Sequence, residues 1–119
     1  MAGPLETAKT ALMAFAGKDR ATMECLIGEP YSFTSPVDNA LSRDSFFARC
    51  WPNSAAFTGM QFIRGAEEGD WAFITYEGEA NGKRFRNTEA HRVVAGRIAE
   101  TEVFFGWNLP HEAKPGGFV

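Results

Sequence analysis

The sequence predicts an α+β domain in which helices come first and an antiparallel sheet follows. The expected order is helix, helix, short strand, helix and then four strands, because residues from 55 onward alternate apolar and polar side chains. Asn81-Gly82 supplies the strongest short hairpin signal, since both turn residues tolerate a positive φ. Helices segregated from strands are typical of α+β folds. We therefore expect one domain over residues 1–119, with an irregular tail at 110–119.

Each predicted helix has its own start and stop signals. Pro4 suits the permissive first position of the first helix, whose apolar residues recur at helical spacing before Gly17. Asp19 can cap a short second helix, and Gly28-Glu29-Pro30 is expected to stop it. A third helix begins after Ser42, presents an apolar face and ends at residues 52–53.

The strand signals are strongest in the second half of the chain. Residues 31–34 alternate and predict one short early strand, which Ser35-Pro36 breaks, and Asp38-Asn39 is expected to be loop. Polar residues 67–70 and the Ala95-Gly96 pair separate the later strands. The resulting meander has predicted strands at 57–64, 71–80, 83–94 and 97–107.

An unusual polar row lies within the strand predicted at 83–94. Side chains two residues apart on a strand share a face. The row on one face is therefore Phe85, Asn87, Glu89, His91 and Val93. It begins and ends apolar but holds an amide, a carboxyl and an imidazole, and the alternate residues are expected to face water. Polar groups on a covered face are costly to bury without partners, so this row predicts a cavity.

Composition argues against several classes of protein. A net charge of -3 and a pI near 5.4, with lysines and arginines scattered singly, argue against nucleic-acid binding. No apolar run approaches the about 20 residues of a membrane span, and no signal peptide is apparent. Cys25 and Cys50 lack metal-binding or redox spacing and are expected to be free thiols in a cytoplasmic protein. Metal signals are weak, because the only histidines are His91 and His111. We expect no metal and no organic cofactor.

Three pieces of the sequence, taken in this order, suggest a known fold. They are the Ser35-Pro36-Val37 break, the helix ending at residues 46–51, and the final Ala95-Gly96-Arg97-Ile98 followed by residues 103–107. The order resembles the nuclear-transport-factor-2-like (NTF2-like) superfamily, in particular its SnoaL-like and steroid-isomerase-like branches. The resemblance implies a cone-shaped α+β barrel, also called cystatin-like. Three N-terminal helices would pack in a strongly bent, mainly antiparallel sheet with a pocket at its open end.

The resemblance implies only one of the three groups that steroid isomerases use. Their general-base aspartate precedes the proline of the first strand break, where this chain has Ser35. Their oxyanion-hole tyrosine on the first helix aligns with Ala11. Their second oxyanion group, an aspartic acid on the penultimate strand, aligns near Glu89. The chain is therefore not expected to be a ketosteroid isomerase, whereas other acid/base chemistry remains open.

Glu89 is the first candidate catalytic residue. In an apolar cavity, desolvation would disfavour its charged form and raise its pKa, so that it donates a proton or a hydrogen bond. The alternative is a structural carboxylate paired with Arg86, Arg92 or His91. The apolar residues expected to line the same cavity are Phe33, Phe57, Phe85 and Trp107.

His91 and Asp38 are the other two catalytic candidates. His91 shares the face of Glu89 and can shuttle protons near neutral pH, unless it is simply a histidine bonded across the sheet. Asp38 would replace the missing base from the rim of the pocket, although Asp38-Asn39 is also ordinary turn chemistry. Ser35 and Asn87 are expected to hydrogen-bond a ligand.

The leading hypothesis is a SnoaL-like enzyme that performs acid/base chemistry on an apolar small molecule, in the isomerase, hydrolase, cyclase or dehydratase class. The competing hypothesis is a non-catalytic ligand-binding or dimerisation module of the same fold. Residues 57–76 carry apolar side chains on both faces of their strands. A covered outer face predicts a homodimer packed sheet to sheet.

Overall fold

A curved six-stranded sheet organises the chain in a computed structural model that describes residues 3–109 and Glu112. The tail predicted at 110–119 lies, apart from Glu112, outside the described residues. In chain order the elements are α1 (Pro4–Ala16), α2 (Arg20–Leu26), β1 (Ile27–Ser35), β2 (Asp38–Leu41), α3 (Arg43–Arg49), a 3₁₀ helix η1 (Trp51–Ala56), β3 (Phe57–Glu68), β4 (Trp71–Ala80), β5 (Lys83–Val94) and β6 (Arg97–Phe105).

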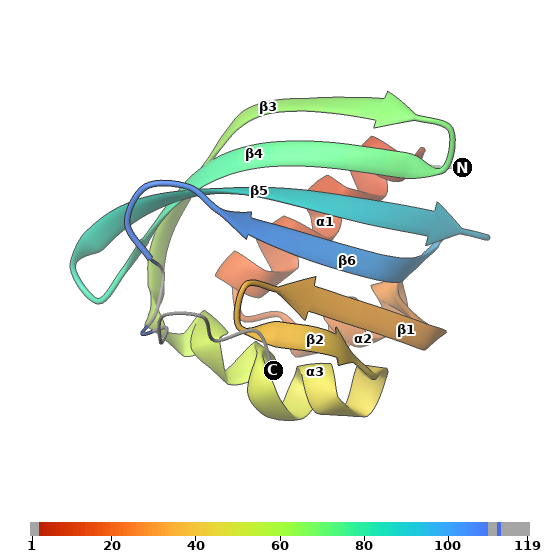
Figure 1. The fold of residues 1–119 in the computed structure, drawn as a ribbon, viewed down its shortest axis with the longest axis horizontal. Helices are drawn as coiled ribbons and strands as arrows, with labels where there is room; N and C mark the ends of the chain where they lie inside the picture. Colours follow the sequence, from red (N-terminus) through yellow and green to blue (C-terminus); the bar gives the residue numbers. More distant parts are fainter. Residues whose placement is uncertain (1–2, 110–111, 113–119) are drawn as a thin grey trace.

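The strands lie in the order β2-β1-β6-β5-β4-β3 (Figure 1). In the part of the chain that the structure describes, only β1 and β6 pair in parallel, and every other neighbouring pair is antiparallel. Within the described residues β2 and β3 form the two edges, so the bent sheet stays open and does not close into a barrel. The predicted α+β class and the mainly antiparallel, strongly bent sheet are confirmed.

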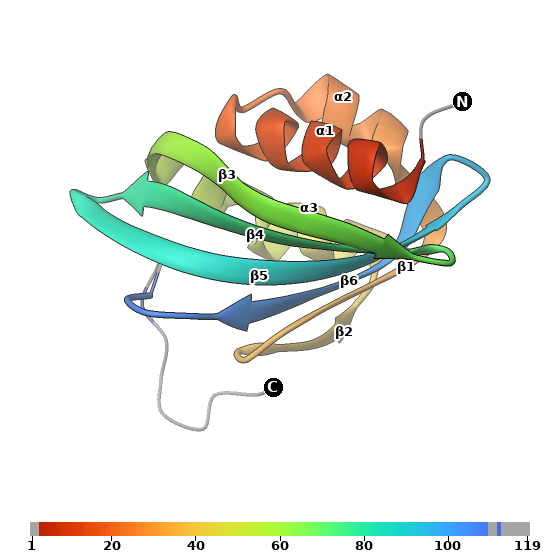
Figure 2. The same cartoon turned by 90° about the horizontal axis from the view of Figure 1, so that it is seen from above.

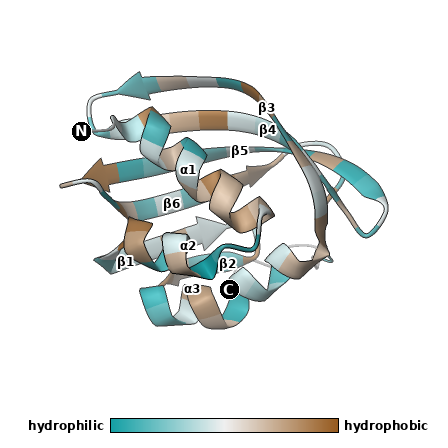
Figure 3. Cartoon of the chain, turned by 180° about the vertical axis from the view of Figure 1, so that it is seen from behind, coloured by the Kyte–Doolittle hydropathy of each residue, from teal (hydrophilic) through white to brown (hydrophobic). Residues whose placement is uncertain are grey.

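Helix α1 lies across the concave face of the sheet, and α2 and α3 lie toward its β1–β2 side (Figures 2 and 3). Small residues let α1 approach closely: Ala8 is fully buried and Ala11 nearly so. The carboxylate of Glu67 on β3 accepts a hydrogen bond from the amide of Leu5, which satisfies one of the unpaired donors of the first turn. The interior therefore lies between these helices and the concave face.

The predicted caps of the short helices are confirmed. The side chain of Asp19 accepts from the amide of Thr22 at 3.1 Å, and that of Ser42 accepts from the amide of Ser45 at 3.2 Å. The end of the third helix differs from the prediction. Helix α3 ends at Arg49, and the chain continues through Pro52 as a 3₁₀ helix, whose tighter turn accommodates proline near its start.

Two boundaries predicted in the first half are wrong. The second helix ends before Gly28, as predicted, but the first strand does not begin at Tyr31. Ile27 already adopts an extended conformation and pairs with Ile98, which extends β1 by four residues toward the N-terminus. Asp38-Asn39 is not loop: Asp38 begins β2 and pairs with Ser35. Long-range pairing to β6 and a short hairpin decide these segments, and neither is visible in local sequence.

The predicted meander is confirmed, with β3 extending to Glu68 and β6 ending at Phe105. Asn81 and Gly82 have φ of 55° and 77°, and Ala95 and Gly96 have 53° and 77°. Two consecutive positive φ values define the turn type that matches the twist of a hairpin. Both turns therefore hold β5 between β4 and β6.

Candidate functional site

A cavity of about 90 Å³ lies between the helices and the concave face, with residues from all ten elements in its wall. Most of the wall is apolar. Seven of the residues predicted from sequence line it: Phe33, Ser35, Asp38, Phe57, Asn87, Glu89 and His91. The polar row of β5 therefore faces the interior, as its alternation predicts, and is brought together with Ser35 and Asp38 from β1 and β2.

Phe85 and Trp107 are not part of this wall. Phe85 is fully buried, and its ring lies against Gly78, where a Cβ would come within 2.5 Å of it. Trp107 follows β6, is 46% exposed and lies near the guanidinium of Arg86, 5.8 Å from the ring centroid. Phe85 packs against Phe57 and Tyr76 of the wall, and Trp107 lies on the surface.

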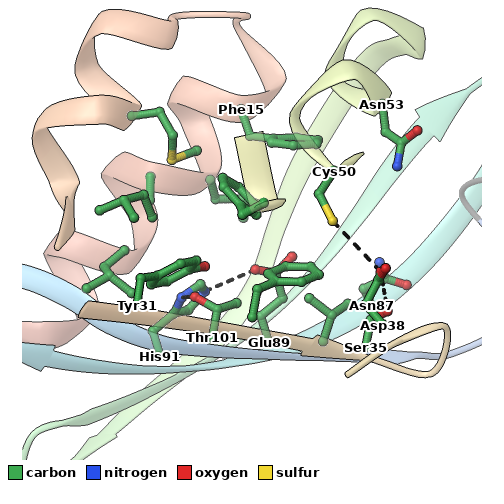
Figure 4. A pocket seen from close by; sticks show the side chains of 18 of the residues that line it. Phe15, Tyr31, Ser35, Asp38, Cys50, Asn53, Asn87, Glu89, His91 and Thr101 are labelled. Atoms are coloured by element: carbon green, nitrogen blue, oxygen red, sulfur yellow. Dashed lines mark hydrogen bonds and ion pairs between the residues drawn. The ribbon is translucent and has the colours of Figure 1, made fainter. Parts of the chain in front are cut away.

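Glu89 is at the centre of the first polar cluster (Figure 4). The hydroxyl of Tyr76 donates to its Oε2 at 2.7 Å. Nε2 of His91 lies 3.0 Å from Oε1 but is not aligned with it as a hydrogen bond. Both neighbouring groups, the hydroxyl of Tyr76 and the imidazole of His91, are able to donate, so the carboxyl oxygens of Glu89 face donors.

The cluster continues from Glu89 along the sheet in both directions. Nδ1 of His91 lies 2.9 Å from the hydroxyl of Thr101, which also bonds the hydroxyl of Tyr31. On the other side, Nδ2 of Asn87 donates to the hydroxyl of Tyr76 at 3.2 Å. Four consecutive strands of the sheet, β1, β6, β5 and β4, thus contribute to one series of polar contacts.

Both tyrosines in this series of polar contacts are neutral. Burial, followed by the charge of Glu89, raises the pKa of Tyr76 well above its ordinary value. Burial also raises the pKa of Tyr31, partly opposed by its hydrogen bond with Thr101. Both phenols therefore keep their protons across the physiological range.

Asp38 is at the centre of a second polar cluster (Figure 4). Its Oδ2 accepts from the hydroxyl of Ser35 at 2.9 Å and lies 3.8 Å from the thiol of Cys50, while its Oδ1 lies 3.3 Å from Nη2 of Arg49. Burial, followed by the negative charge of Asp38, raises the pKa of Cys50 to about 12. Cys50 is therefore a thiol that donates to Asp38, and not a nucleophile.

Sequence reasoning missed Tyr76, Tyr31, Thr101 and Cys50 as cavity residues. A signal for Tyr76 was available. The two-residue turn at Asn81-Gly82 fixes the pairing of β4 with β5, and counting back from it sets Tyr76 directly opposite Asn87. Tyr76 therefore faces the same side as the polar row.

Two further observations concern metal binding and membrane-spanning helices. Among residues 3–109 and Glu112, no three His, Cys, Asp or Glu side chains are grouped so that they could hold a metal ion. In the same part of the chain, no helix is both long and apolar enough to cross a membrane.

Comparisons with known proteins show the fold. No protein-family model matches this sequence, and no curated protein matches it. Solved structures do match. The first is a protein from Kribbella flavida DSM 17836, with a TM-score of 0.79 and 22% identity over 86% of this chain and 85% of that one. The second is an NTF2-like protein of unknown function from Cytophaga hutchinsonii, with a TM-score of 0.70 and 15% identity over 84% and 87%.

A proposed ketosteroid isomerase from Kribbella flavida DSM 17836 matches with a TM-score of 0.73 and 14% identity, over 94% of this chain and 82% of that one. The chain therefore has the NTF2-like fold, and the predicted resemblance is confirmed at this level. Because this fold serves many functions, the chemistry must be argued from the cavity.

Proposed function

We propose that this protein is a SnoaL-like small-molecule enzyme in which Glu89 acts as a general base without a cofactor. The observation that supports it most directly is the hydrogen bond from Tyr76 to a cavity-lining carboxylate at 2.7 Å. A carboxylate held by a neutral donor in an apolar wall is oriented for proton transfer. This favours the base role for Glu89 over the proton-donor role expected from the sequence.

In the proposed reaction, Glu89 removes a proton from carbon or oxygen of the bound molecule, and the electron pair stays on the substrate. Tyr76 keeps its proton and orients the carboxylate throughout. His91 is the proposed second group, since its Nε2 lies 3.0 Å from Oε1 of Glu89 and has no aligned partner. It can take up the proton and return it at another atom, which is how an isomerisation or an elimination is completed.

Asp38 is proposed to bind rather than to catalyse. Both of its oxygens already face donors, from Ser35 and Cys50 on one side and from Arg49 on the other. A base has to exchange such partners for a substrate proton. Ser35, Asn87, Phe33 and Phe57 are proposed to contact the ligand from the remaining wall.

The volume of the cavity limits the proposed substrate. About 90 Å³ is below the ~150 Å³ of a cavity that takes up benzene. It is also below the roughly 300–1,000 Å³ of pockets for drug-sized ligands. The proposed substrate is therefore a molecule of few non-hydrogen atoms, and a steroid requires displacement of wall side chains. The small volume argues against ketosteroid isomerisation. So do Ser35 and Ala11, which stand where the steroid isomerases have their general base and their oxyanion-hole tyrosine.

Deuterium exchange tests proton abstraction without knowledge of the natural substrate. Hydroxyacetone is small enough to be tried and carries a hydroxyl donor, and its uptake of deuterium from D₂O beside the carbonyl is followed by proton NMR. We expect exchange catalysed by the protein, lowered roughly 100- to 10,000-fold in Glu89→Gln. His91→Ala is expected to lower it less.

Glu102→Gln is the matched control, because Glu102 lies on β6 between Thr101 and Val103 and so faces the opposite side of the sheet. It should leave the exchange unchanged. Exchange that is equal in the parent protein and in Glu89→Gln would contradict a base role for Glu89. No exchange of hydroxyacetone by the parent protein would favour a non-catalytic module.

The alternative, a non-catalytic ligand-binding or dimerisation module, has its own supporting observation. Phe73 and Phe104 on the outer face of the sheet are 40% and 49% exposed, and Trp71 stacks beside Phe73 with ring centroids 6.4 Å apart. We propose that a second copy of the chain covers this face, whether the protein is an enzyme or a non-catalytic module. The free thiols Cys25 and Cys50 support a proposed location in the reducing cytoplasm.

Sedimentation velocity tests the proposed homodimer. The parent protein is expected to sediment as a dimer and Phe73→Glu as a monomer, because a charge in the centre of an apolar interface has no partner. Phe62→Glu is the control: Phe62 is 38% exposed but lies beside Lys9 of α1 on the other face. A monomeric parent protein, or equal dissociation in both variants, would refute the interface.

A further inference from the structure

We propose that the cavity selects a small, mainly apolar molecule carrying a hydrogen-bond donor, with a protonated amine bound more tightly than the matching alcohol and the matching carboxylate excluded. The inference rests on the proposed function, because it takes the cavity as a ligand site. It adds the charge class of the ligand, which the proposed reaction leaves open.

The charges around the cavity are the first observation. Among the residues that the structure describes, the wall contains two carboxylates, Asp38 and Glu89, and no lysine or arginine. Arg49 lies 3.3 Å from Asp38, but its own side chain is 53% exposed and is not part of the wall. His91 is the only described residue of the wall that can carry a positive charge. An anionic ligand would face like charge without a dedicated cation, whereas an ammonium group would have a carboxylate partner.

Asn87 supplies a second and independent observation. It lines the cavity and is 3% exposed, and its Oδ1 has no hydrogen-bond partner among the described residues. The orientation of the amide follows from its neighbours. Tyr76 has one hydroxyl proton and gives it to Glu89, so the group that Asn87 turns toward Tyr76 must be its NH₂. Oδ1 is therefore left as a buried acceptor that a ligand N–H or O–H can satisfy.

The donors already present in the wall are largely used. The hydroxyl protons of Tyr76 and Ser35 both go to carboxylates, and the thiol of Cys50 lies beside Asp38. The acceptors left for a ligand are Oδ1 of Asn87 and the two carboxylates, whereas the remaining donors of the wall are the amide of Asn53 and Nε2 of His91, which lies 3.0 Å from Glu89. A ligand whose polar end only accepts hydrogen bonds matches this arrangement poorly, and the apolar remainder of the wall suits a short hydrocarbon body.

Three probes of nearly the same shape separate the possibilities: n-butylamine, 1-butanol and butyrate, each titrated at neutral pH into ¹⁵N-labelled protein. Chemical-shift changes are followed at the amides of the cavity wall. We expect affinity in the order amine, alcohol, carboxylate, with the amine at least about tenfold tighter than butyrate because its hydrogen bond is charge-assisted.

Variants identify the groups responsible. Glu89→Gln is expected to remove most of the preference for the amine over 1-butanol while 1-butanol still binds, and Asp38→Asn tests the second carboxylate in the same way. Asn87→Leu is expected to weaken the binding of both n-butylamine and 1-butanol. Glu102→Gln makes the same change of charge on the opposite face of the sheet and should keep the order of affinities.

The outcomes distinguish the inference from the function on which it rests. Butyrate binding as tightly as n-butylamine would overturn the charge preference and leave the proposed base intact. Loss of the preference in Glu102→Gln would also overturn it, because the effect would then come from net charge alone. Absence of cavity shifts with all three probes would overturn both the inference and the ligand site.

Discussion

Tyr76→Phe tests whether the hydroxyl of Tyr76 holds the carboxylate of Glu89. The substitution removes one oxygen that donates to Glu89 at 2.7 Å and accepts from Asn87 at 3.2 Å, at a residue that is 3% exposed. Its ring packing stays, including the edge-to-face contact with Phe85 at 6.2 Å. A hydrogen bond to a charged group contributes about 1.5–3 kcal/mol. We expect urea denaturation to show a loss of roughly that size in the free energy of unfolding, with an unchanged m-value.

Thr75→Val is the matched control for this experiment. Thr75 precedes Tyr76 on β4, and its hydroxyl bonds that of Thr88 at 2.8 Å at a partly buried position. Valine keeps the shape and loses only this bond between neutral groups, so we expect a cost of about 0.5–1 kcal/mol. A loss in Tyr76→Phe no larger than in Thr75→Val would refute the reasoning that Tyr76 stabilises a charged carboxylate.

Three further predictions concern stability. Gly78→Ala should destabilise the protein by roughly 1–3 kcal/mol in urea, because the new Cβ would lie 2.5 Å from the fully buried ring of Phe85; an unchanged midpoint would mean that the ring can move aside. Between pH 9 and 10 the unfolded protein loses the proton of Cys50 while the folded protein, with that pKa at about 12, keeps it. The unfolded state then binds fewer protons, so stability falls with rising pH by up to about 1.4 kcal/mol per pH unit; Cys50→Ala should flatten this slope, and an equal slope would contradict the burial of the thiol. Ala95→Asn should raise the free energy of unfolding by roughly 0.5–1 kcal/mol, since Ala95 has a φ of 53° in a two-residue turn; a loss of stability in the same assay would contradict this assignment of strain.

The sequence carries enough information to predict the polar row but not its full set of partners. Alternation alone sets Asn87, Glu89 and His91 on one face of β5, and the structure has all three in the wall of the cavity. A turn count from Asn81-Gly82 would also have added Tyr76, because no register shift interrupts the β4–β5 pairing.

The same count fails on the other side of β5. From the Ala95-Gly96 turn it pairs His91 with Glu100, but the register shifts between Arg92 and Val93, and His91 pairs with Thr101. An extra residue in one strand moves every later side chain to the other face. No local residue pattern marks this shift, so the partner of His91 could not be derived from the sequence.

Asp38 shows a different limit. Its turn-forming neighbour Asn39 predicts loop, whereas β1 recruits Asp38–Leu41 as an edge strand and buries the carboxylate beside Ser35. Tertiary pairing overrides the weak local preference of such a short segment. The position of Asp38 in the cavity wall therefore depends on contacts that only the folded chain provides.

The protonation state of Glu89 at neutral pH tests the central claim most directly. Infrared difference spectra between the parent protein and Glu89→Gln, with ¹³C-labelled glutamate to assign the band, report whether the side chain is a carboxylate or a carboxylic acid. The donors around Glu89 predict a carboxylate band that disappears in the variant. If the band that disappears in the variant is instead the carbonyl band of a carboxylic acid, the base role is contradicted. The proton-donor role expected from the sequence would then be restored.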